Sequence, residues 1–537
     1  MRDTAAEVRD TAIRAYRRIR ARARRYGRRI RQHWRTATPH QQQTARVATG
    51  SAALGLVVAV TVVAMTGPWD SGQRTAEQSW AAAREGRSGG NHTGDGPGGK
   101  PAPAAPRVLA AIDPAAGAGA GSGAGREAKP SHGPGAAGVP APSAAALADT
   151  LEPLVEDGDL GKRRALSVVD AATGRQLYAV KPRTADTPAS TVKLATAVAA
   201  LSARGADHRI ETRVVRGGSS DKVVLVGGGD PTLTAGQLGD LARSTARKLH
   251  KDDTGKVSLA YDTSRYSGPV RHSIGPNDNL APVTPLMVDE ARLEGTSKRP
   301  LHGPAPRSAD PSSDAADAFA DALGKHGIDV KGEPKKAGAP GKAKELAAHR
   351  SAPLSALVER MLTHSDNDIA EALARQTALA SGEPASFKGA GKAVRHHLGK
   401  LGLPLKGAHF ADGSGLDRDD KVSPALLTRL LVRAADSKHA ELRPVLTGLP
   451  VAHFTGTLDS RYGSEKGKPG AGLVRAKTGT LTGVNSLAGT VVDADGRLLV
   501  FAFMTSGTTD GKAAQETLDR LASALANCGC RDSPSAG

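Results

Sequence analysis

Most of what can be inferred from this chain starts at residues 188–201, which read PASTVKLATAVAAL. Apolar side chains recur after Lys193 at helical spacing, which predicts a buried helix. Ser190 and Lys193 lie three residues apart, so on a helix their side chains share one face. A serine hydroxyl attacks a carbonyl only after a base takes its proton, and a lysine with a lowered pKa is such a base. The segment therefore predicts a nucleophile and its base.

The same spacing occurs a second time, at Ser219-Ser220-Asp221-Lys222. This copy abuts a predicted strand instead of opening an apolar helix. We therefore assign the nucleophile to Ser190 and expect the second copy to have no catalytic role.

A second motif, Ser365-Asp366-Asn367, interrupts helical sequence on both sides. Ser365 is predicted to relay a proton between lysines and a leaving amine, and the Asn367 amide to hold a substrate backbone. The structural alternative is an ordinary helix N-cap, because serine, aspartate and asparagine are all good caps.

The third motif is Lys477-Thr478-Gly479, within alternating sequence that predicts a strand. Lys477 and Thr478 are expected to face a substrate carboxylate, and Gly479 to let a ligand approach the backbone. The backbone N–H groups of Ser190 and Thr480 are predicted to form an oxyanion hole. The alternative is a solvated edge strand that happens to contain a lysine.

The three motifs occur in the order found in serine enzymes that are acylated by peptides or β-lactams. Burial and the charge of Lys477 are the expected causes of a lowered pKa at Lys193. His364, beside the second motif, is expected to be structural because the lysines already serve as bases. The sequence contains no motif for a metal site, so we predict no metal and no organic cofactor.

The N-terminal region differs sharply from the rest. The chain has 537 residues and a net charge of +19, of which residues 1–46 carry +11, with 14 arginines against three acidic residues. An uncharged apolar stretch follows, assigned to residues 47–67, and is long enough to span a bilayer. The positive-inside rule predicts a cytoplasmic N-terminus, a single-pass anchor in membrane lipid and an extracellular catalytic domain. A cleaved signal peptide is the alternative, but the basic region is far longer than is usual.

Arginines in the tail are not accompanied by a base-reading motif, so we consider nucleic acid an unlikely partner and favour a topology signal. Residues 68–145 are rich in Gly, Ala and Pro and predict a disordered linker. The two cysteines, Cys528 and Cys530, lie in the C-terminal tail, and their pairing stays open.

Order is predicted from about residue 146. The sequence indicates a hairpin at 166–180, a helix after Ser190, and a final strand and helix at 498–506 and 513–526. Between them, residues 206–308 show short strands and turns and are interpreted as an inserted domain. The expected organisation is a tail (1–46), an anchor (47–67), a linker (68–145), a catalytic domain in two parts (146–205 and 309–527), the insertion (206–308) and a C-terminal tail (528–537).

The chain resembles the D-alanyl-D-alanine carboxypeptidase/endopeptidases of the penicillin-binding-protein-4 type, the class C low-molecular-mass penicillin-binding proteins. The resemblance spans about residues 147–526 and includes further motifs as well as the three above. These are GGDPTL (228–233), HSDNDIAE (364–371), DGSGL (412–416) and AKTGTLTG (476–483). The gap of 175 residues between Ser190 and Ser365 is similar to that family's inserted domain and too long for class A β-lactamases.

This resemblance implies an α/β (α+β) β-lactamase/transpeptidase-like fold, with an antiparallel sheet flanked by helices and a helical lobe. It also implies that Ser190 attacks the penultimate D-Ala of peptidoglycan stem peptides, that cross-links are a further substrate, and that β-lactam antibiotics inhibit the enzyme. Two alternatives remain: a β-lactamase or serine esterase, and a catalytically weak sensor that binds the cell wall.

Overall fold

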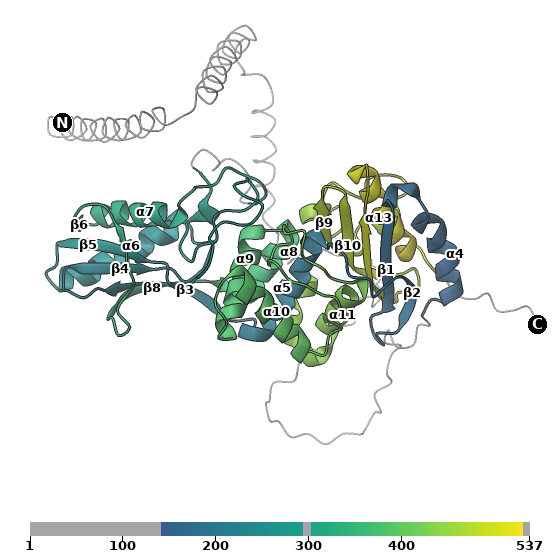
Figure 1. The fold of residues 1–537 in the computed structure, drawn as a ribbon, viewed down its shortest axis with the longest axis horizontal. Helices are drawn as coiled ribbons and strands as arrows, with labels where there is room; N and C mark the ends of the chain where they lie inside the picture. The colour runs from purple at the N-terminus through teal and green to yellow at the C-terminus, as the bar shows by residue number, and fades with distance from the viewer. Residues whose placement is uncertain (1–140, 294–301, 530–537) are drawn as a thin grey trace, which may run out of the picture. The chain divides into compact units, whose positions relative to one another are not determined.

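The computed structural model describes residues 141–293 and 302–529. The predicted tail, anchor, most of the linker and Cys530 lie outside the described residues. Within them, no helix is both long and apolar enough to cross a membrane. The described residues form a mixed α/β fold with two sheets (Figure 1).

Along the chain, strands alternate with helices as far as β8. The helices α8 to α12 follow, and the strands β9 to β11 and the helix α13 end the described region. The helices are α4 (Ala144–Val155), α5 (Lys193–Arg204), α6 (Ala235–Lys251), α7 (Pro311–Lys325), α8 (Leu354–His364), α9 (Asn367–Ala380), α10 (Phe387–Lys400), α11 (Pro424–Ala435), α12 (Pro444–Thr447) and α13 (Gly511–Ala526). The strands are β1 (Arg163–Asp170), β2 (Gln176–Val180), β3 (Arg209–Arg216), β4 (Lys222–Val226), β5 (Lys256–Asp262), β6 (Asp329–Val330), β7 (Lys335–Lys336), β8 (Glu345–Pro353), β9 (Val474–Leu481), β10 (Val484–Val492) and β11 (Leu498–Ser506).

The first sheet has the order β2-β1-β11-β10-β9, and every neighbouring pair is antiparallel. Its central strand β11 reads LLVFAFMTS and is buried on both faces. Because side chains alternate along a strand, Val500, Ala502 and Met504 enter one core, while Phe501 and Phe503 enter the other. The continuous apolar run thus reflects helices on both faces of the sheet.

The two faces are covered by different parts of the chain. On one face α4 and α13 pack, drawing the N-terminal and C-terminal ends of the described region together. On the other face lie α5, α8, α9 and α11, which form a helical lobe around α5. Figure 1 shows β9 at the edge of this sheet, opposite the edge formed by β2. An edge strand has unpaired backbone groups on one side, which matters for the site below.

The second sheet has the order β6-β5-β4-β3-β8, with β7 also paired to β5. Helices α6 and α7 pack on it, and Phe319 of α7 is fully buried in their shared core. The sheet continues past the boundary expected at residue 308, because β8, at 345–353, pairs with β3. The helical pattern of α7 was assigned to the catalytic domain, but its apolar face packs on the second sheet.

Several local predictions are confirmed. The hairpin of β1 and β2, the helix after Ser190, and the final strand and helix all form where expected. The prediction of only short strands and turns past Arg204 is wrong for α6, a 17-residue helix with a capping box at Thr234. That helix has a clear amphipathic pattern and a Thr-x-x-Gln start, so the sequence contained its signal.

Candidate active site

Ser190 lies in a short 3-10 helix, Ala189–Val192, that runs directly into α5. The preceding Ala189 adopts a positive φ of 49°, which turns the chain sharply before the serine. Ser190 is half-buried, while Thr191 and Val192 are buried and fix the segment in the core. The hydroxyl is therefore held at the accessible end of an otherwise buried helix.

Lys193 is fully buried, and its Nζ contacts three oxygens. It donates hydrogen bonds to Ser190 Oγ at 2.9 Å, Asn367 Oδ1 at 2.7 Å and the Ser414 carbonyl oxygen at 2.5 Å. Burial lowers the pKa of Lys193 to about 8, although nearby carboxylates, Asp412 first, act in the opposite direction. The expected pair of nucleophile and base is thus in contact.

Ser365 and Asp366 have separate roles. Ser365 ends α8 in the left-handed conformation, with φ 56° and ψ 38°. Asp366 is the N-cap of α9, and its carboxylate accepts from Ile369 N at 3.0 Å. The cap anticipated as the structural alternative is therefore made by Asp366. The side chain of Ser365 is not needed for it and accepts from Lys477 Nζ at 2.9 Å.

Asn367 is the first residue of α9 and has both ends of its amide engaged. Its Oδ1 accepts from Lys193, and its Nδ2 donates to the Asn279 carbonyl oxygen at 3.0 Å. The expected contact with a substrate backbone stays a prediction. The structure adds that Asn367 holds the buried end of Lys193.

Lys477 is also fully buried and joins the third motif to the second. Its Nζ donates to Ser365 Oγ and, at 2.7 Å, to the carbonyl oxygen of Thr478. Burial, and after it the charge of Lys193, lowers the pKa of Lys477 well below its usual range. The charge of one lysine was expected to lower the pKa of the other, and this effect is found at Lys477. The lowered pKa of Lys193 is caused mainly by burial.

The outer edge of β9 borders the motifs. The start of the strand pairs with residues 450–452 on that side, so the free edge of β9 is the part at residues 478–480. Ala476 N donates outward to the Pro450 carbonyl oxygen, not to β10. Since N–H groups alternate in direction along a strand, those of Thr478 and Thr480 point the same way as that of Ala476. Among the described residues neither has a backbone acceptor on that side. The edge can therefore receive an extended peptide, with the Thr480 N–H directed toward it.

Gly479 has a packing role in addition to the expected approach of a ligand, which stays a prediction. A Cβ at this position would come within 2.2 Å of Ser486 Oγ and 2.6 Å of the Pro188 carbonyl oxygen. The glycine thus allows β9 to pack against the segment that precedes the nucleophile. The close approach is within the protein itself and sets the distance between Ser190 and the strand edge.

The predicted site residues did not include the turn at 412–417, although its sequence, DGSGL, is one of the family motifs. The turn at 412–417 brings the Ser414 carbonyl oxygen against Lys193 and 3.4 Å from Ser190 Oγ. A backbone carbonyl leaves no residue-type signal, so only the unusual spacing of glycines around Ser414 pointed to it.

Within residues 141–293 and 302–529, two buried groups have the residue types of metal ligands: His272, Glu371 and Asp412, and Glu290, Asp366 and Asp368. In each group the candidate ligand atoms lie within 4.8 Å of one another. Arg375 pairs with Glu371 in the first group, and Arg292, Arg307 and Arg360 contact the second. Guanidinium groups already supply the positive charge, so both arrangements fit hydrogen-bonded ion networks better than metal centres.

His364 stacks on His302 with ring centroids 4.0 Å apart, and burial lowers its pKa. No described contact links it to the nucleophile.

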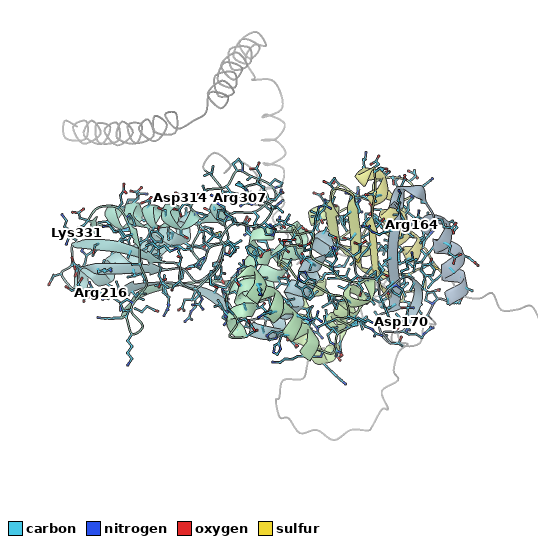
Figure 2. All side chains as sticks on the ribbon, in the orientation of Figure 1. Arg164, Asp170, Arg216, Arg307, Asp314 and Lys331 are labelled. Atoms are coloured by element: carbon cyan, nitrogen blue, oxygen red, sulfur yellow. The ribbon has the colours of Figure 1, made fainter. Side chains whose placement is uncertain are left out.

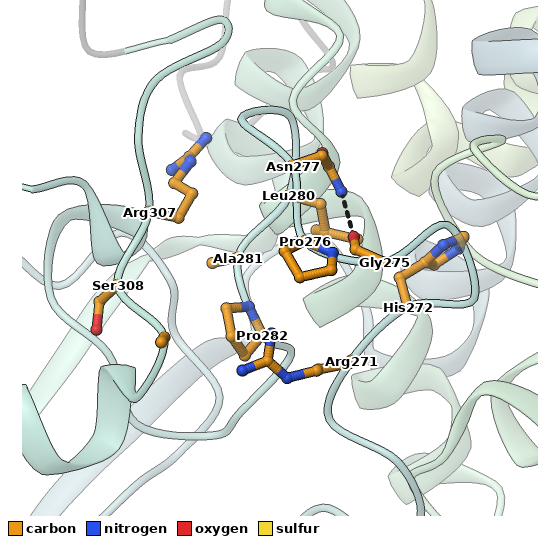
Figure 3. A pocket seen from close by; sticks show the side chains of 11 residues that line it. Arg271, His272, Gly275, Pro276, Asn277, Leu280, Ala281, Pro282, Arg307 and Ser308 are labelled. Carbon is orange, nitrogen blue, oxygen red and sulfur yellow. Dashed lines mark hydrogen bonds between the residues drawn. The ribbon is translucent and has the colours of Figure 1, made fainter. Parts of the chain in front are cut away.

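A cavity of about 90 Å³ is lined mainly by the loop 271–282, with Arg307 and Ser308 on its other side (Figure 3). Through Asn279 this loop also touches Asn367, so it borders the site.

The chain is similar in sequence to known proteins. The model of the D-Ala-D-Ala carboxypeptidase 3 (S13) family matches residues 147–306 and 302–527. A carboxypeptidase of Mycobacterium tuberculosis is 36% identical over 412 residues, covering 72% of this chain and 85% of that protein. The carboxypeptidase DacB of Mycolicibacterium smegmatis is 36% identical over 407 residues, covering 73% and 86%.

A solved structure is similar as well. The crystal structure of penicillin binding protein 4 from Haemophilus influenzae has a TM-score of 0.59 and 25% sequence identity, covering 70% of this chain and 97% of that one. The family match covers well over half of the chain, and it includes all three motifs. The chain therefore belongs to the D-Ala-D-Ala carboxypeptidase 3 (S13) family.

Proposed function

We propose that this protein is a serine-type D-Ala-D-Ala carboxypeptidase that acts on peptidoglycan stem peptides through an acyl-enzyme on Ser190. The observation that carries the proposal is the contact between Ser190 Oγ and the buried Nζ of Lys193. Family membership supports the reaction class. The proposal concerns the residues that perform each step and the substrate they receive.

The surroundings of Lys193 favour a base over a permanent cation. Two of its three partners, the Asn367 and Ser414 oxygens, are carbonyl oxygens that can only accept. A neutral amine has two N–H bonds and one lone pair. If the two N–H bonds serve the carbonyl oxygens, the lone pair is left for the Ser190 hydroxyl proton. The pKa of about 8 makes this neutral form accessible near physiological pH.

The reaction then proceeds in two halves. Ser190 Oγ attacks the carbonyl carbon of the penultimate D-Ala while Lys193 takes its proton, and the resulting oxyanion is received by the N–H groups of Ser190 and Thr480. The oxyanion collapses and the C–N bond to the terminal D-Ala breaks. The leaving amine receives the proton that Lys193 took from Ser190, relayed through Ser365, which Lys477 contacts, so Lys193 is neutral again in the acyl-enzyme. Water hydrolyses the ester and restores the serine.

Substrate is proposed to lie along the free edge of β9. Its terminal carboxylate is received near Lys477 and Thr478, whose hydroxyl donates to Thr457 Oγ1 at 2.8 Å. A β-lactam carries a carboxylate and a strained amide in similar positions, so it should acylate Ser190. A D-Ala cross-link presents the same bond, which makes endopeptidase action the second activity to assay.

The test is D-Ala release from a pentapeptide ending in D-Ala-D-Ala, measured with the full chain beside penicillin labelling of Ser190 by mass spectrometry. We expect D-Ala release and a slowly hydrolysed penicillin adduct on Ser190. Rapid penicillin turnover would instead indicate a β-lactamase. A stable adduct without D-Ala release would indicate a sensor.

We also propose that residues 47–67 anchor the protein in membrane lipid, with the N-terminus in the cytoplasm and the catalytic domain outside. The support is the charge asymmetry and apolar length of the sequence. Protease added to intact cells should remove a C-terminal tag and leave an N-terminal tag protected. A protein recovered without its N-terminal tag, in the culture medium, would contradict the anchor.

A further inference from the structure

We propose that Asp412 is a positioning residue for Lys193, acting through the Ser414 carbonyl, and that His272 of the loop 271–282 holds Asp412 in place. The inference rests on the proposed function, in which Lys193 is the base. It links a loop that lies between β5 and α7, outside the three motifs, to the activation of the nucleophile.

Asp412 organises the turn that presents the Ser414 carbonyl. Its Oδ1 accepts from Ser414 N at 2.9 Å and Gly415 N at 2.6 Å, while Oδ2 accepts from Asp417 N at 2.8 Å and Ser414 Oγ at 3.1 Å. The side chain is buried. Four donors around one carboxylate define the path of the turn, and with it the direction of the carbonyl that contacts Lys193.

Gly415 shows how tightly this turn fits against the nucleophile. Its φ is +84°, and a Cβ would come within 2.1 Å of the Ala189 carbonyl oxygen and 3.0 Å of Ser190 N. A shift of the turn would therefore move either the Ser414 carbonyl or the nucleophile segment itself. Displacements of about 1 Å in such sites are costly to the rate.

His272 is the partner of Asp412 on the other side. Its Nε2 lies 2.9 Å from Asp412 Oδ2, and its Nδ1 accepts from Ile274 N at 3.2 Å. Because Nδ1 is an acceptor, Nε2 bears the proton and donates to Asp412. The next residue, Ser273, donates to Asp417 Oδ2 at 2.8 Å, so the loop contacts both ends of the turn. In Figure 3 the His272 ring points away from Arg307, on the far side of the cavity.

The groups that face Asp412 come from several elements. From α9, Glu371 accepts from Gly413 N at 3.0 Å and pairs with Arg375. Arg375 lies over the ring of Phe387, which in turn meets the edge of His272. Asp420 accepts from Asp412 N at 3.3 Å and from Ala411 N.

Asp412 differs from Glu371 and Asp420 in the direction in which its surroundings shift its pKa. Burial acts to raise its pKa, but the hydrogen bonds from His272 and the surrounding donors hold that pKa far below the usual range. Burial and the charge of Asp412 raise the pKa of Asp420 well above its usual range. Burial and Asp412 also raise the pKa of Glu371. Asp412 is the first of the carboxylates that raise the pKa of Lys193, followed by Asp366, Glu371 and Asp420.

Two effects of Asp412 can therefore be separated by experiment. Its hydrogen bonds hold the Ser414 carbonyl, so their loss should lower the limiting rate of acylation. Its negative charge favours protonated Lys193, so removal of the charge should lower the pKa of Lys193. A residue that merely stabilised the fold would not produce the second effect.

The experiment uses full-length protein with Asp412→Asn, and measures the rate constant of acylation by a fluorescent penicillin from pH 6 to 10. We expect the limiting rate to fall about 10- to 100-fold, and the midpoint of the acid limb to move about half a pH unit or more to lower pH. Asp221→Asn, which removes an exposed carboxylate, is the matched control and should change neither. A folded Asp412→Asn protein with an unmoved midpoint would overturn the proposal, whatever its limiting rate.

Two variants of His272 keep the proposal testable if Asp412→Asn does not fold. His272→Ala removes the donor to Asp412 and should slow acylation several-fold, whereas His272→Gln retains a donor and should recover most of the rate. Equal rates for His272→Ala and wild type would overturn the role of His272. These failures differ from failure of the proposed function, in which the wild-type protein itself would form no adduct on Ser190 or release no D-Ala.

Discussion

Two regions of this molecule carry Ser-x-x-Lys and could hardly differ more. Lys193 is fully buried, and its Nζ contacts the serine three residues before it. Lys222 begins β4 at the edge of a turn, and Ser219 is exposed and donates to Asp221 at 2.7 Å. Lys331 forms a solvent-exposed ion pair with the same Asp221. Figure 2 shows Lys331 next to the end of β6. Spacing alone therefore does not make a nucleophile.

The difference lies in what surrounds each lysine. Around Lys193, two carbonyl oxygens direct the amine and burial disfavours its charge, so the amine can serve as a base. Ser219, by contrast, is exposed, and its hydroxyl donates to the Asp221 carboxylate instead of contacting a buried amine. The Ser-x-x-Lys pattern alone therefore does not predict a base. The lysine must also be buried, with acceptor oxygens that direct its amine toward the serine.

The largest difference between the two regions is expected when each serine is replaced by alanine. Ser190→Ala should reduce acylation by penicillin about 10⁴-fold or more, because no other group can form the ester. Ser219→Ala should acylate at the wild-type rate. Labelling with fluorescent penicillin measures both. If the label persisted in Ser190→Ala and disappeared in Ser219→Ala, the two regions would have to exchange roles.

The lysines should follow the same pattern with a smaller effect. Lys193→Met removes the base while retaining much of the side-chain volume, so acylation should fall about 10²- to 10⁴-fold. Lys222→Met should have no effect on the acylation rate. Stopped-flow kinetics with a chromogenic β-lactam would measure both, and equal losses in the two variants would show that neither lysine acts as the base.

A glycine near each region extends the test to packing. Gly479→Ala places a Cβ within 2.6 Å of the Pro188 backbone, so the free energy of unfolding should fall by about 1–3 kcal/mol and acylation should slow more than about tenfold. Gly218→Ala adds a Cβ with nothing within 4 Å and should be neutral. Urea denaturation and penicillin labelling provide the two readouts. Wild-type stability in Gly479→Ala would mean that β9 and the nucleophile segment can move apart freely.

The smallest expected effect is that of pH. Lys193 must be neutral to accept a proton, and its pKa of about 8 means that the neutral fraction rises as pH rises through 8. Acylation should increase about tenfold between pH 7 and 9 and then level off. Lys222→Met should show the same profile. A rate independent of pH over this range would contradict a base with that pKa.

The sequence was informative where local pattern and chemistry coincide. The hairpin of β1 and β2 and the doubly buried β11 follow from apolar runs and turn residues. Ser190, Lys193, Ser365 and Lys477 were predicted as one site. In the structure they form two hydrogen-bonded pairs, Ser190 with Lys193 and Ser365 with Lys477, and Asn367 joins the second motif to Lys193. Order and residue type sufficed here because the chemistry demands those side chains.

Prediction was weaker where the partner in a contact is distant in sequence. The extent of the second sheet depends on β8 pairing with β3 across more than 120 residues, and the helix α7 has the same local pattern whichever sheet it covers. The packing of Gly479 against Pro188 was not predicted, because the two residues are almost 300 positions apart in the sequence. The separate roles of Ser365 and Asp366 appeared only with the backbone conformation at the end of α8.

The residue types and the order of the three motifs were enough to indicate the reaction class and to predict Ser190 as the nucleophile, because the chemistry requires those side chains. The tertiary structure was needed to show that Lys193 is buried against the Ser414 and Asn367 oxygens. It was also needed to show that Asp412 holds the turn at Ser414 and that His272 contacts Asp412. The physical reason is that burial and hydrogen bonding are properties of surroundings. The Asn367 and Ser414 oxygens come from segments more than 170 residues away from Ser190 along the chain, and His272 comes from a third segment.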